Sequence, residues 1–505
     1  MKSVLAVDEG TTGSRALVIG EDGRVLSRGY REIPQHFPRP GWVEHDPEDL
    51  WRATLDAARD ALREAGTRPD ALGITNQRET VCVWDRTSGR PLARAIVWQD
   101  RRTADRCAAL ADSPQGALIR DRTGLVLDPY FSGTKIEWLM EQVPAVRNQV
   151  SGGEAVFGTV DSWLLYRLTG GKTFATDHTN ASRTLLYDIH RRTWDDDLLA
   201  IFGVPKGALA EVRASSGDFG VATAEHFGFE IPVLGIAGDQ QAALYGQGCW
   251  KAGEAKNTYG TGAFLLLNTG DRPARSTSGL LTTVACDATG APAYALEGSV
   301  FIAGAAVQWL RDGLGIISRA DETDAIARSV PDSGGVTFVP AFVGLGAPQW
   351  EAAARGTLVG LTRGTTRAHL VRATLEAMAF STRDLLAAMA ADSGLALSAL
   401  QVDGGASAND WLMQFQADLL GVTVARPDLV ETTALGAAGL AGVAAGVWGK
   451  ADDFLARRTF RRFSPGAGAD AARARLHDWR RAVDTALWWA RAGRDDIERT
   501  SKEPG

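Results

Sequence analysis

Cysteine, histidine and long basic or apolar runs are scarce in this sequence. Its four cysteines, Cys82, Cys107, Cys249 and Cys286, are far apart and show no CxxC spacing. With only seven scattered histidines beside them, they offer no obvious metal cage. We therefore expect small, mostly buried cysteines of a reducing compartment.

The charge and hydropathy patterns argue against nucleic-acid and membrane partners. The net charge is −7, and there is no long run of Lys and Arg, so any phosphate site must be a local pocket. The N-terminus reaches Asp8 and Glu9 before any apolar core of signal-peptide length. The least polar run, 434–448, is mostly Ala and Gly and is shorter than a membrane span. We expect a cytoplasmic protein in which this run forms a tightly packed helix.

The chain is too long for a single hydrophobic core. It has 505 residues, 45% of them hydrophobic, and two large domains are the natural expectation for that size. Predicted strands and helices alternate, which is typical of α/β folds. The strand pattern restarts at Gly253, and we therefore expect domains at 1–252 and 253–505.

The opening stretch predicts two strands joined by a tight polar turn. The short apolar runs 4–7 and 16–19 flank a turn of glycines and threonines. Glycines bring backbone N–H groups close to a ligand, and hydroxyls add donors. Arg15 adds positive charge, and Asp8 could hold Mg²⁺. This chemistry suits the phosphate tail of a nucleotide, and a plain surface hairpin fits the stretch equally well.

A second hairpin echoes the first one. Residues 257–267 place a small Gly-Thr-Gly turn, 260–262, between apolar strands, as 10–13 does in the opening stretch. Matching turns in two halves suggest a duplicated architecture with the ligand between the halves.

Two charged groups follow predicted buried strands. Arg78 and Glu79 come after the strand 71–75, and they could hydrogen-bond small hydroxyls or form a structural ion pair. Asp239 follows the strand 231–236, where it could accept a proton from a substrate hydroxyl. The competing interpretation makes Asp239 the N-cap of the next helix.

Other candidate features carry less information when each is taken alone. The turn at 404–405 lies between a strand and a helix, where it could bind a ligand or serve only as a turn. Trp98, Tyr130 and Phe264 taken singly would be ordinary core aromatics.

A helix is predicted from Asp46 as N-cap to about Gly66. Further predicted elements are a strand at 95–98, a strand at 336–342 and helices at 303–311, 369–390, 410–420 and 471–492.

Taken together, these stretches resemble the FGGY carbohydrate kinases, and within them the glycerol kinases. The resemblance runs in the family's order from about residue 3 to 465. Gly41–Pro47 together with Thr75–Thr80 is the most specific part, because phosphate-type turns occur in many ATPases. The other matching stretches are 8–12, 95–99, 128–134, 180–183, 238–242, 257–262, 340–348 and 403–405.

The resemblance implies a fold and a reaction. The fold is α/β, of the actin-like (ribonuclease H-like) ATPase type, with two related domains around a cleft for nucleotide and substrate. The reaction is the transfer of phosphate from ATP to glycerol with Mg²⁺, giving sn-glycerol 3-phosphate. Relatives form dimers and tetramers, so a homodimer or homotetramer is expected.

The resemblance also assigns roles residue by residue. Asp239 is implied as the catalytic base, and Asp8 with Asp239 as the metal-side carboxylates. The implied glycerol-binding residues are Arg78, Glu79, Trp98, Tyr130, Asp239, Gln240 and Phe264. The implied nucleotide-binding residues are Thr11, Thr12, Gly13, Arg15, Thr261, Gly304, Gln308, Gly405 and Asn409.

Two alternatives stay open at this point. One is a kinase for another polyol or ketose, such as erythritol or xylulose, although Arg78-Glu79 with Trp98 favours glycerol. The other is a non-catalytic actin-like ATPase, which has no need for Asp239-Gln240 or Arg78-Glu79.

Four departures from the family pattern affect affinity and regulation. Glu9 replaces the Gln of many members, and Gly13 replaces a Ser, so we expect altered nucleotide affinity. Residues 224–232 lack the Gly-rich, Arg-bearing loop with which some bacterial relatives bind fructose 1,6-bisphosphate, so we expect no inhibition by that sugar. His226 lies near the histidine that is phosphorylated in other relatives, but the spacing differs, and we expect an exposed loop histidine.

Overall fold

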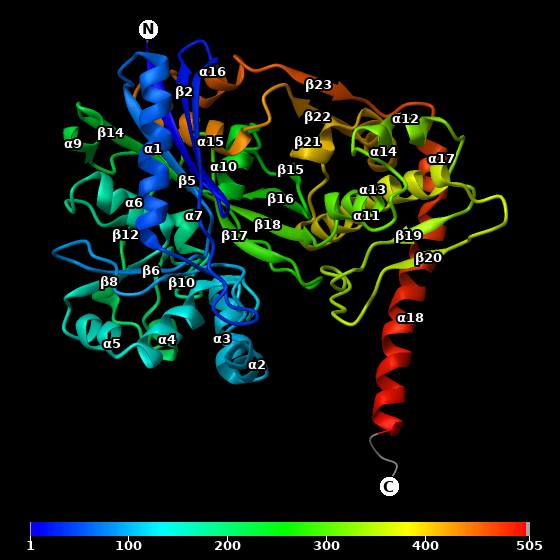
Figure 1. Cartoon of the computed structure of the whole chain (residues 1–505), viewed down its shortest axis with the longest axis horizontal. Coiled ribbons are helices and arrows are strands. Elements are labelled where there is room, and N and C mark those ends of the chain that lie inside the picture. Colours follow the sequence, from blue (N-terminus) through cyan, green and yellow to red (C-terminus); the bar gives the residue numbers. More distant parts are fainter. Residues whose placement is uncertain (1, 501–505) are drawn as a thin grey trace.

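A computed structural model describes residues 2–500 of the chain, with side chains up to residue 492. Two mixed β-sheets dominate the structure, and each comes from one half of the sequence (Figure 1). The first sheet has the order β13-β14-β5-β1-β2-β3, and the second has the order β17-β18-β16-β15-β21-β22-β23.

The first sheet is built around the opening hairpin. β1 pairs antiparallel with β2 and parallel with β5, which pairs parallel with β14. Its strands are β1 (Ser3–Glu9), β2 (Gly13–Gly20), β3 (Val25–Glu32), β5 (Ala71–Asn76), β13 (Val221–Ala222) and β14 (Ile231–Gly238). The opening hairpin is therefore confirmed.

The second sheet repeats this arrangement. β15 pairs antiparallel with β16 and parallel with β21, and β21 pairs parallel with β22. The repeat confirms two related halves. Its strands are β15 (Glu254–Tyr259), β16 (Ala263–Gly270), β17 (Leu281–Cys286), β18 (Pro292–Val300), β21 (Ala399–Asp403), β22 (Thr423–Pro427) and β23 (Phe460–Phe463).

Helices cover the first sheet on both faces. α1 (Pro47–Ala65) packs on β2 and β3, with Asp46 as N-cap and Gly66 as a left-handed C-cap, as the sequence predicts. α6 (Val160–Leu168) lies against β5 and β14. α15 (Thr432–Ala444) belongs to the second half of the chain, yet it packs against β1, β5 and β14.

The two halves are interlocked by a close helix crossing. α10 (Asp239–Gly246) contacts α15 as well as strands of the second sheet. A Cβ at Gly436 would lie 1.8 Å from the carbonyl oxygen of Ala242, and one at Gly246 would lie 2.3 Å from that of Thr432. Only glycine permits this spacing, which confirms that the Ala/Gly-rich run forms a tightly packed helix.

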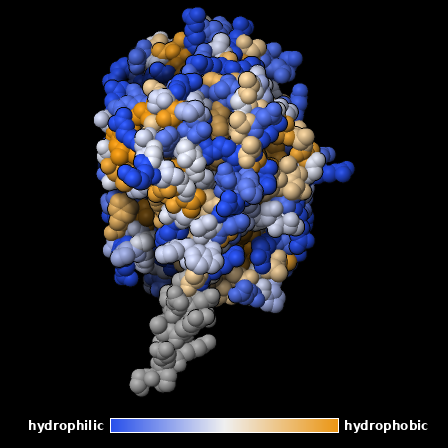
Figure 2. All heavy atoms as spheres, turned by 90° about the vertical axis from the view of Figure 1, so that its right-hand side faces the viewer, coloured by the Kyte–Doolittle hydropathy of each residue, from blue (hydrophilic) through white to orange (hydrophobic). Residues whose placement is uncertain are grey.

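The outer helices of the second half pack on its sheet. α13 (Arg367–Ser393) contacts β16 and β18, and α14 (Asp410–Leu420) contacts β22. α11 (Gly304–Asp312) and α12 (Glu322–Arg328) lie against α13. On this side of the molecule, groups of hydrophobic residues lie among hydrophilic ones (Figure 2).

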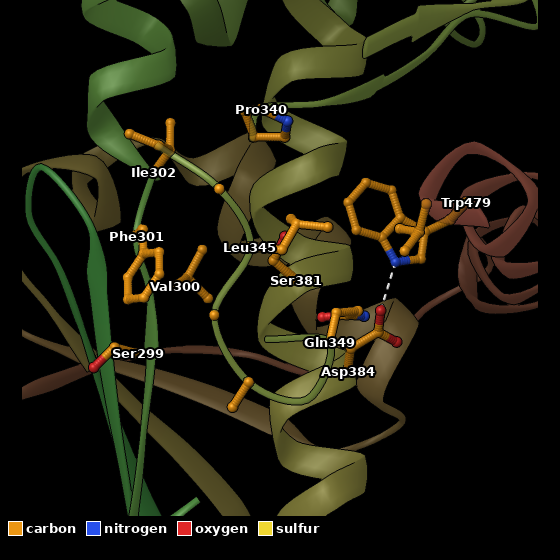
Figure 3. A pocket seen from close by; sticks show the side chains of 14 residues that line it. Ser299, Val300, Phe301, Ile302, Pro340, Leu345, Gln349, Ser381, Asp384 and Trp479 are labelled. Carbon is orange, nitrogen blue, oxygen red and sulfur yellow. Dashed lines mark hydrogen bonds between the residues drawn. The ribbon is translucent and has the colours of Figure 1, made fainter. Parts of the chain in front are cut away.

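The C-terminal region differs from the sequence prediction. The predicted single helix over 471–492 is two helices, α17 (Ala469–Ala474) and α18 (Leu476–Thr500). Trp479 of α18 stacks on Phe380, with ring centroids 5.4 Å apart, and its Nε1 donates to Asp384 Oδ2 at 2.6 Å. Figure 3 shows the hydrogen bond between Trp479 and Asp384 at the wall of a small pocket, which Ser299 and Val300 at the end of β18 also line. These contacts attach α18 to α13.

Two predicted strands are shorter than expected. The predicted strand 95–98 is ordered as a strand only at β7 (Ala95–Ile96), and 336–342 only at β19 (Thr337–Val339). β7 pairs with the two-residue β4 (Glu44–His45), and β19 pairs with β20 (Thr357–Val359). In both cases the partner strand is as short as the observed one.

The remaining elements lie around the first half and at the edges of the second. The helices are α2 (Ala104–Ala111), α3 (Pro114–Thr123), α4 (Ser132–Gln142), α5 (Pro144–Ser151), α7 (His178–Ala181), α8 (Asp196–Ile201), α9 (Ala224–Phe227), α16 (Ala451–Leu455), and the 3₁₀ turns Lys206–Ala208 and Gly405–Ala408. The strands are β6 (Cys82–Asp85), β8 (Ala155–Gly158), β9 (Ala175–Asp177), β10 (Tyr187–Asp188), β11 (Thr193–Trp194) and β12 (Glu211–Arg213).

Two expectations about single residues can be judged from the packing. The four cysteines are free and buried, as expected. The prediction of an exposed loop histidine at 226 is wrong: His226 lies in α9, half-buried against Trp51 with ring centroids 5.0 Å apart. Its Nε2 is 3.0 Å from the carbonyl oxygen of Arg167.

Within residues 2–500, no helix is both long and apolar enough to cross a membrane.

Candidate active site

The first phosphate-type turn joins β1 and β2. Gly10 donates its N–H to the Gly13 carbonyl at 3.1 Å, and the Gln77 side chain donates to the Gly10 carbonyl at 3.1 Å. Thr11 accepts a 2.8 Å hydrogen bond from Nε1 of Trp98. The turn is therefore held by residues that follow β5 and β7.

Asp8, at the start of this turn, is partly buried and faces a second carboxylate. Burial raises its pKa to about 7, with Arg15 acting against the rise and Asp239 adding to it. Asp239 therefore lies close enough to disfavour the negative charge of Asp8. Oxygen donors paired in this way suit a divalent cation, although no group of three or more His, Cys, Asp or Glu gathers within the described part of the chain.

The second turn lies between β15 and β16 and contacts the start of α11. N–H groups of Ala303 and Ala305 donate to the Thr261 carbonyl at 2.9 and 3.0 Å. The N–H of Gly304 donates to the Gly260 carbonyl at 3.0 Å, and a Cβ at Gly304 would lie 2.5 Å from that oxygen. The start of α11 thus fixes the turn through contacts that only glycine allows at position 304.

One cavity collects the predicted nucleotide-binding residues of the second half. Its volume is about 520 Å³, and Asp321, Asp324 and Arg311 lie at its polar edge. Asn409 caps α14 by accepting from Leu412 N at 2.8 Å, while its side-chain NH₂ donates to Thr323 at 3.0 Å. The predicted residues that line this cavity are Thr261, Gly304, Gln308, Gly405 and Asn409.

A larger cavity of about 880 Å³ adjoins the second turn. It is lined by the predicted aromatic residues Trp98, Tyr130 and Phe264. Trp98 and Tyr130 meet edge to face, with ring centroids 5.5 Å apart. Thr261 lines both this cavity and the smaller one, so the second turn lies where the two cavities meet.

Arg78 and Glu79 are almost completely buried, and Arg78 donates to Glu297 and Tyr130, which line this cavity. Arg78 and Glu79 follow β5, and Glu79 has a left-handed backbone with a φ of 63°, which is uncommon for a residue other than glycine. The Arg78 side chain packs against the backbone at Gly238, where a Cβ would lie 2.7 Å from the Cγ of Arg78. Glycine before Asp239 thus leaves room for the arginine.

Asp239 is the first residue of α10 rather than its cap. Gly238 occupies the N-cap position, so the N-cap interpretation of Asp239 is wrong. Asp239 Oδ1 accepts from the Gln240 N–H at 2.7 Å and lies 3.1 Å from Arg78 Nε. The side chain is 32% exposed, so the carboxylate stays accessible to solvent.

Three charged residues of the site were not found by sequence reasoning. Arg183 donates from Nε to Glu79 at 2.6 Å. Glu297 of β18 accepts from both Arg78 and Arg183, and it also lines the larger cavity. Lys256 of β15 donates to the side chains of Gln240 and Thr258. For Glu297 the available signal was a charged residue inside the largely apolar strand 293–298.

The side chains of Arg78, Glu79, Arg183 and Glu297 form a hydrogen-bonded network of opposite charges with little access to water, and the charge of the buried Lys256 acts on it. Burial alone would raise the pKa of Glu297, but Arg183 and Arg78 lower it to about 2. Burial lowers the pKa of Lys256 to about 8, against the opposing effect of Asp403 and Asp239. Buried charges are tolerated when they are paired and hydrogen-bonded in this way. The cleft thus combines a fixed hydrogen-bonding array with one open carboxylate.

Family models match the chain along most of its length. The model of the N-terminal domain of the FGGY family of carbohydrate kinases matches residues 3–246, and the model of its C-terminal domain matches residues 255–445.

Two relatives that match nearly the full chain are glycerol kinases. The glycerol kinase of Bordetella parapertussis is 55% identical over 497 residues, covering 97% of this chain and 98% of the relative. Glycerol kinase 2 of Thermotoga maritima is 53% identical over 493 residues, covering 97% and 99%.

Solved structures agree with the fold. A glycerol kinase of Plasmodium falciparum with ADP superposes with a TM-score of 0.92 at 36% identity, covering 96% of this chain and 98% of that one. A xylulose kinase of Lactobacillus acidophilus superposes with a TM-score of 0.87 at 21% identity, covering 96% and 98%, and shows the shared fold alone.

Proposed function

The chain belongs to the FGGY family of carbohydrate kinases, and from this membership we propose that it transfers the γ-phosphoryl group of ATP to glycerol. The products are ADP and sn-glycerol 3-phosphate. The observation that carries the proposal is the polar array of Arg78, Glu79 and Asp239 beside two adjoining cavities, in a chain about 55% identical to glycerol kinases.

Glycerol is recognised by hydrogen bonds rather than by apolar burial. Gln240 supplies donors, and Glu79 and Asp239 supply acceptors for its hydroxyls. Arg78 donates to a hydroxyl of glycerol in place of its 3.2 Å hydrogen bond to Tyr130. A site built to pair every hydroxyl rejects analogues that leave a buried partner unpaired. Trp98, Tyr130 and Phe264 form the wall along the carbon chain and exclude water from it.

ATP occupies the smaller cavity and reaches toward the first turn. Thr261, Gly304, Gln308, Gly405 and Asn409 hold the nucleoside end, and Thr261 lies where that cavity meets the polyol cavity. Backbone N–H groups and hydroxyls of Thr11, Thr12 and Gly13, with the charge of Arg15, hold the phosphates.

Asp239 accepts the proton of the attacking hydroxyl. Its carboxylate is partly exposed and is held by the Gln240 N–H and by Arg78. Since phosphoryl transfer depends mainly on positioning and charge neutralisation, a carboxylate held in a fixed position is sufficient.

Asp8 and Asp239 would hold Mg²⁺. The mutual proximity of the two carboxylates and the raised pKa of Asp8 fit a cation that relieves their repulsion. Mg²⁺ in kinase sites uses one or two carboxylates together with phosphate oxygens and water, and when bound it neutralises charge on the phosphates.

A substrate panel tests the proposal. We expect kcat/KM with ATP to be larger for glycerol than for erythritol, xylulose or other polyols and ketoses. A larger kcat/KM for a four- or five-carbon substrate would move the assignment to another kinase of the family. ATP turnover that no polyol or sugar stimulates would indicate a non-catalytic actin-like ATPase.

Location, assembly and domain boundaries complete the proposal. The enzyme acts in the cytoplasm as a homodimer or homotetramer, which light scattering on the purified protein tests. The boundary at 252/253 falls between the stretches matched by the two family models, and limited proteolysis tests it.

A further inference from the structure

Glu297 enters the substrate site from the opposite half of the molecule. It lies on β18 of the second sheet, whereas Arg78, Glu79 and Arg183 come from the first half. Its side chain is 1% exposed. The contact with Arg78 joins residues 219 positions apart in the sequence.

The pairing with Arg78 is bidentate. Arg78 Nη1 donates to Glu297 Oε2 at 2.7 Å, and Nη2 donates to Oε1 at 3.0 Å. Two parallel N–H···O bonds fix the plane and the rotation of a guanidinium, which a single contact would not. Glu297 Oε1 also accepts from Arg183 Nη2 at 3.0 Å, and this third bond holds the carboxylate itself.

The fixed rotation of the guanidinium determines which side chains the other N–H groups of Arg78 face. With both Nη atoms held by Glu297, the Nε edge lies 3.1 Å from Asp239 Oδ1. The second hydrogen of Nη2 points to the Tyr130 hydroxyl at 3.2 Å, and that of Nη1 to Gln241 at 3.2 Å. Glu297 thereby sets Arg78 toward the base and toward the aromatic wall of the cavity.

We propose that Glu297 is a positioning residue that orients Arg78 for polyol binding, so that the second half completes a substrate site built on the first. The inference rests on the proposed glycerol kinase activity. It assigns Glu297 an effect on glycerol and none on the nucleotide, because Glu297 lines the larger cavity and not the smaller one.

A purely structural ion pair would behave differently. Its loss would lower stability and leave the kinetics of the folded enzyme unchanged. The chain offers a matched control in Glu376, a buried glutamate of α13 that pairs with Arg372 at 3.1 Å and with Arg475. Both glutamates lie in the second half and have two arginine partners, but Glu376 lines neither of the two cavities.

The test compares Glu297→Gln with Glu376→Gln in the full-length enzyme. Glycerol turnover by the unmodified enzyme is measured first, and its absence would refute the proposed function rather than the role of Glu297. We expect Glu297→Gln to raise the glycerol KM at least tenfold with the ATP KM within twofold. Glu376→Gln should leave both constants within twofold while lowering the melting temperature.

A double variant tests whether the effect passes through Arg78. If Glu297 acts by orienting Arg78, the glycerol KM of Glu297→Gln with Arg78→Gln equals that of Arg78→Gln alone. Additive effects, equal rises in both KM values, or an unchanged glycerol KM would overturn the proposal.

A conservative variant covers the case in which Glu297→Gln does not fold. Glu297→Asp keeps the charge but shortens the side chain by one methylene, so it loses the bidentate geometry, and a smaller rise in the glycerol KM is expected. Failure of both variants to fold would assign Glu297 to stability alone and would overturn the proposal as well.

Discussion

Trp98 donates a 2.8 Å hydrogen bond from its indole Nε1 to the hydroxyl of Thr11. One residue thus belongs to the wall of the larger cavity and also holds the first phosphate-type turn. Sequence reasoning assigned Trp98 only an apolar role. The bond couples the polyol side of the cleft to the phosphate side.

Replacing Trp98 with Phe separates these two roles. Phe keeps an aromatic wall but cannot donate to Thr11. We expect the ATP KM to rise about threefold, because one hydrogen bond that holds the turn is lost, while the glycerol KM stays within twofold. Steady-state kinetics with each substrate varied in turn provide the measurement.

Trp84→Phe is the matched control for that substitution. Trp84 is fully buried and its Nε1 has no hydrogen-bond partner, so its loss should lower stability without changing either KM. A rise in the glycerol KM of Trp98→Phe with an unchanged ATP KM would contradict the coupling.

Asp239→Asn tests the proton acceptor. Asn keeps the size of the side chain and can still accept from the Gln240 N–H, but it is not a base. We expect kcat to fall by about 10²–10⁴, the usual contribution of a positioned base, and ADP affinity to stay within twofold. A coupled assay and calorimetry provide the two measurements, and near-normal turnover would remove Asp239 from this role.

Glu9 makes the stability of the protein depend on pH. It is fully buried, and burial raises its pKa from its ordinary 4.5 to about 8, with the Thr54 hydroxyl acting against the rise. Between these values the unfolded chain releases a proton that the folded protein keeps. The free energy of unfolding therefore falls as pH rises from about 4.5 to 8, by up to about 1.4 kcal/mol per pH unit.

Glu9→Gln should remove this contribution, because Gln does not ionise and can still accept from Thr54. We expect the loss of stability between pH 6 and 8 to become smaller in the variant, as measured by urea unfolding at both values. The exposed Glu225 provides the control Glu225→Gln, whose pH dependence should match the unmodified protein. An unchanged slope in Glu9→Gln would show that Glu9 is already ionised at pH 6.

Local patterns were sufficient to predict much of the fold. The opening hairpin, the capped helix that starts after Asp46, and the repeated strand arrangement follow from short-range alternation, capping residues and glycine turns. The break after Ala474 was missed, because no Pro or Gly interrupts the amphipathic pattern there. The short pairing of β7 depends on β4, a strand about 50 residues earlier, which no local pattern reports.

In the candidate site, too, local patterns predicted some residues and missed those that depend on distant parts of the chain. The sequence pointed to Arg78, Glu79 and Asp239 because each follows a predicted strand. Glu297 was missed because its partner is 219 residues away and on the other sheet. The environment of Gly13 was also outside the reach of the sequence: a Cβ there would lie 2.4 Å from the hydroxyl of Tyr30. A side chain at position 13 would therefore displace the half-exposed ring of Tyr30.

Gly304→Ala tests whether the start of α11 holds the second turn. The new Cβ would lie 2.5 Å from the Gly260 carbonyl oxygen, and because that oxygen belongs to the backbone, the turn itself must shift. The shift moves Thr261, where the two cavities meet, so we expect the ATP KM to rise at least tenfold. Gly207→Ala, where a Cβ meets nothing within 4 Å, controls for a glycine substitution as such. An ATP KM within twofold of normal in Gly304→Ala would show that the turn tolerates the shift and that its geometry does not limit nucleotide binding.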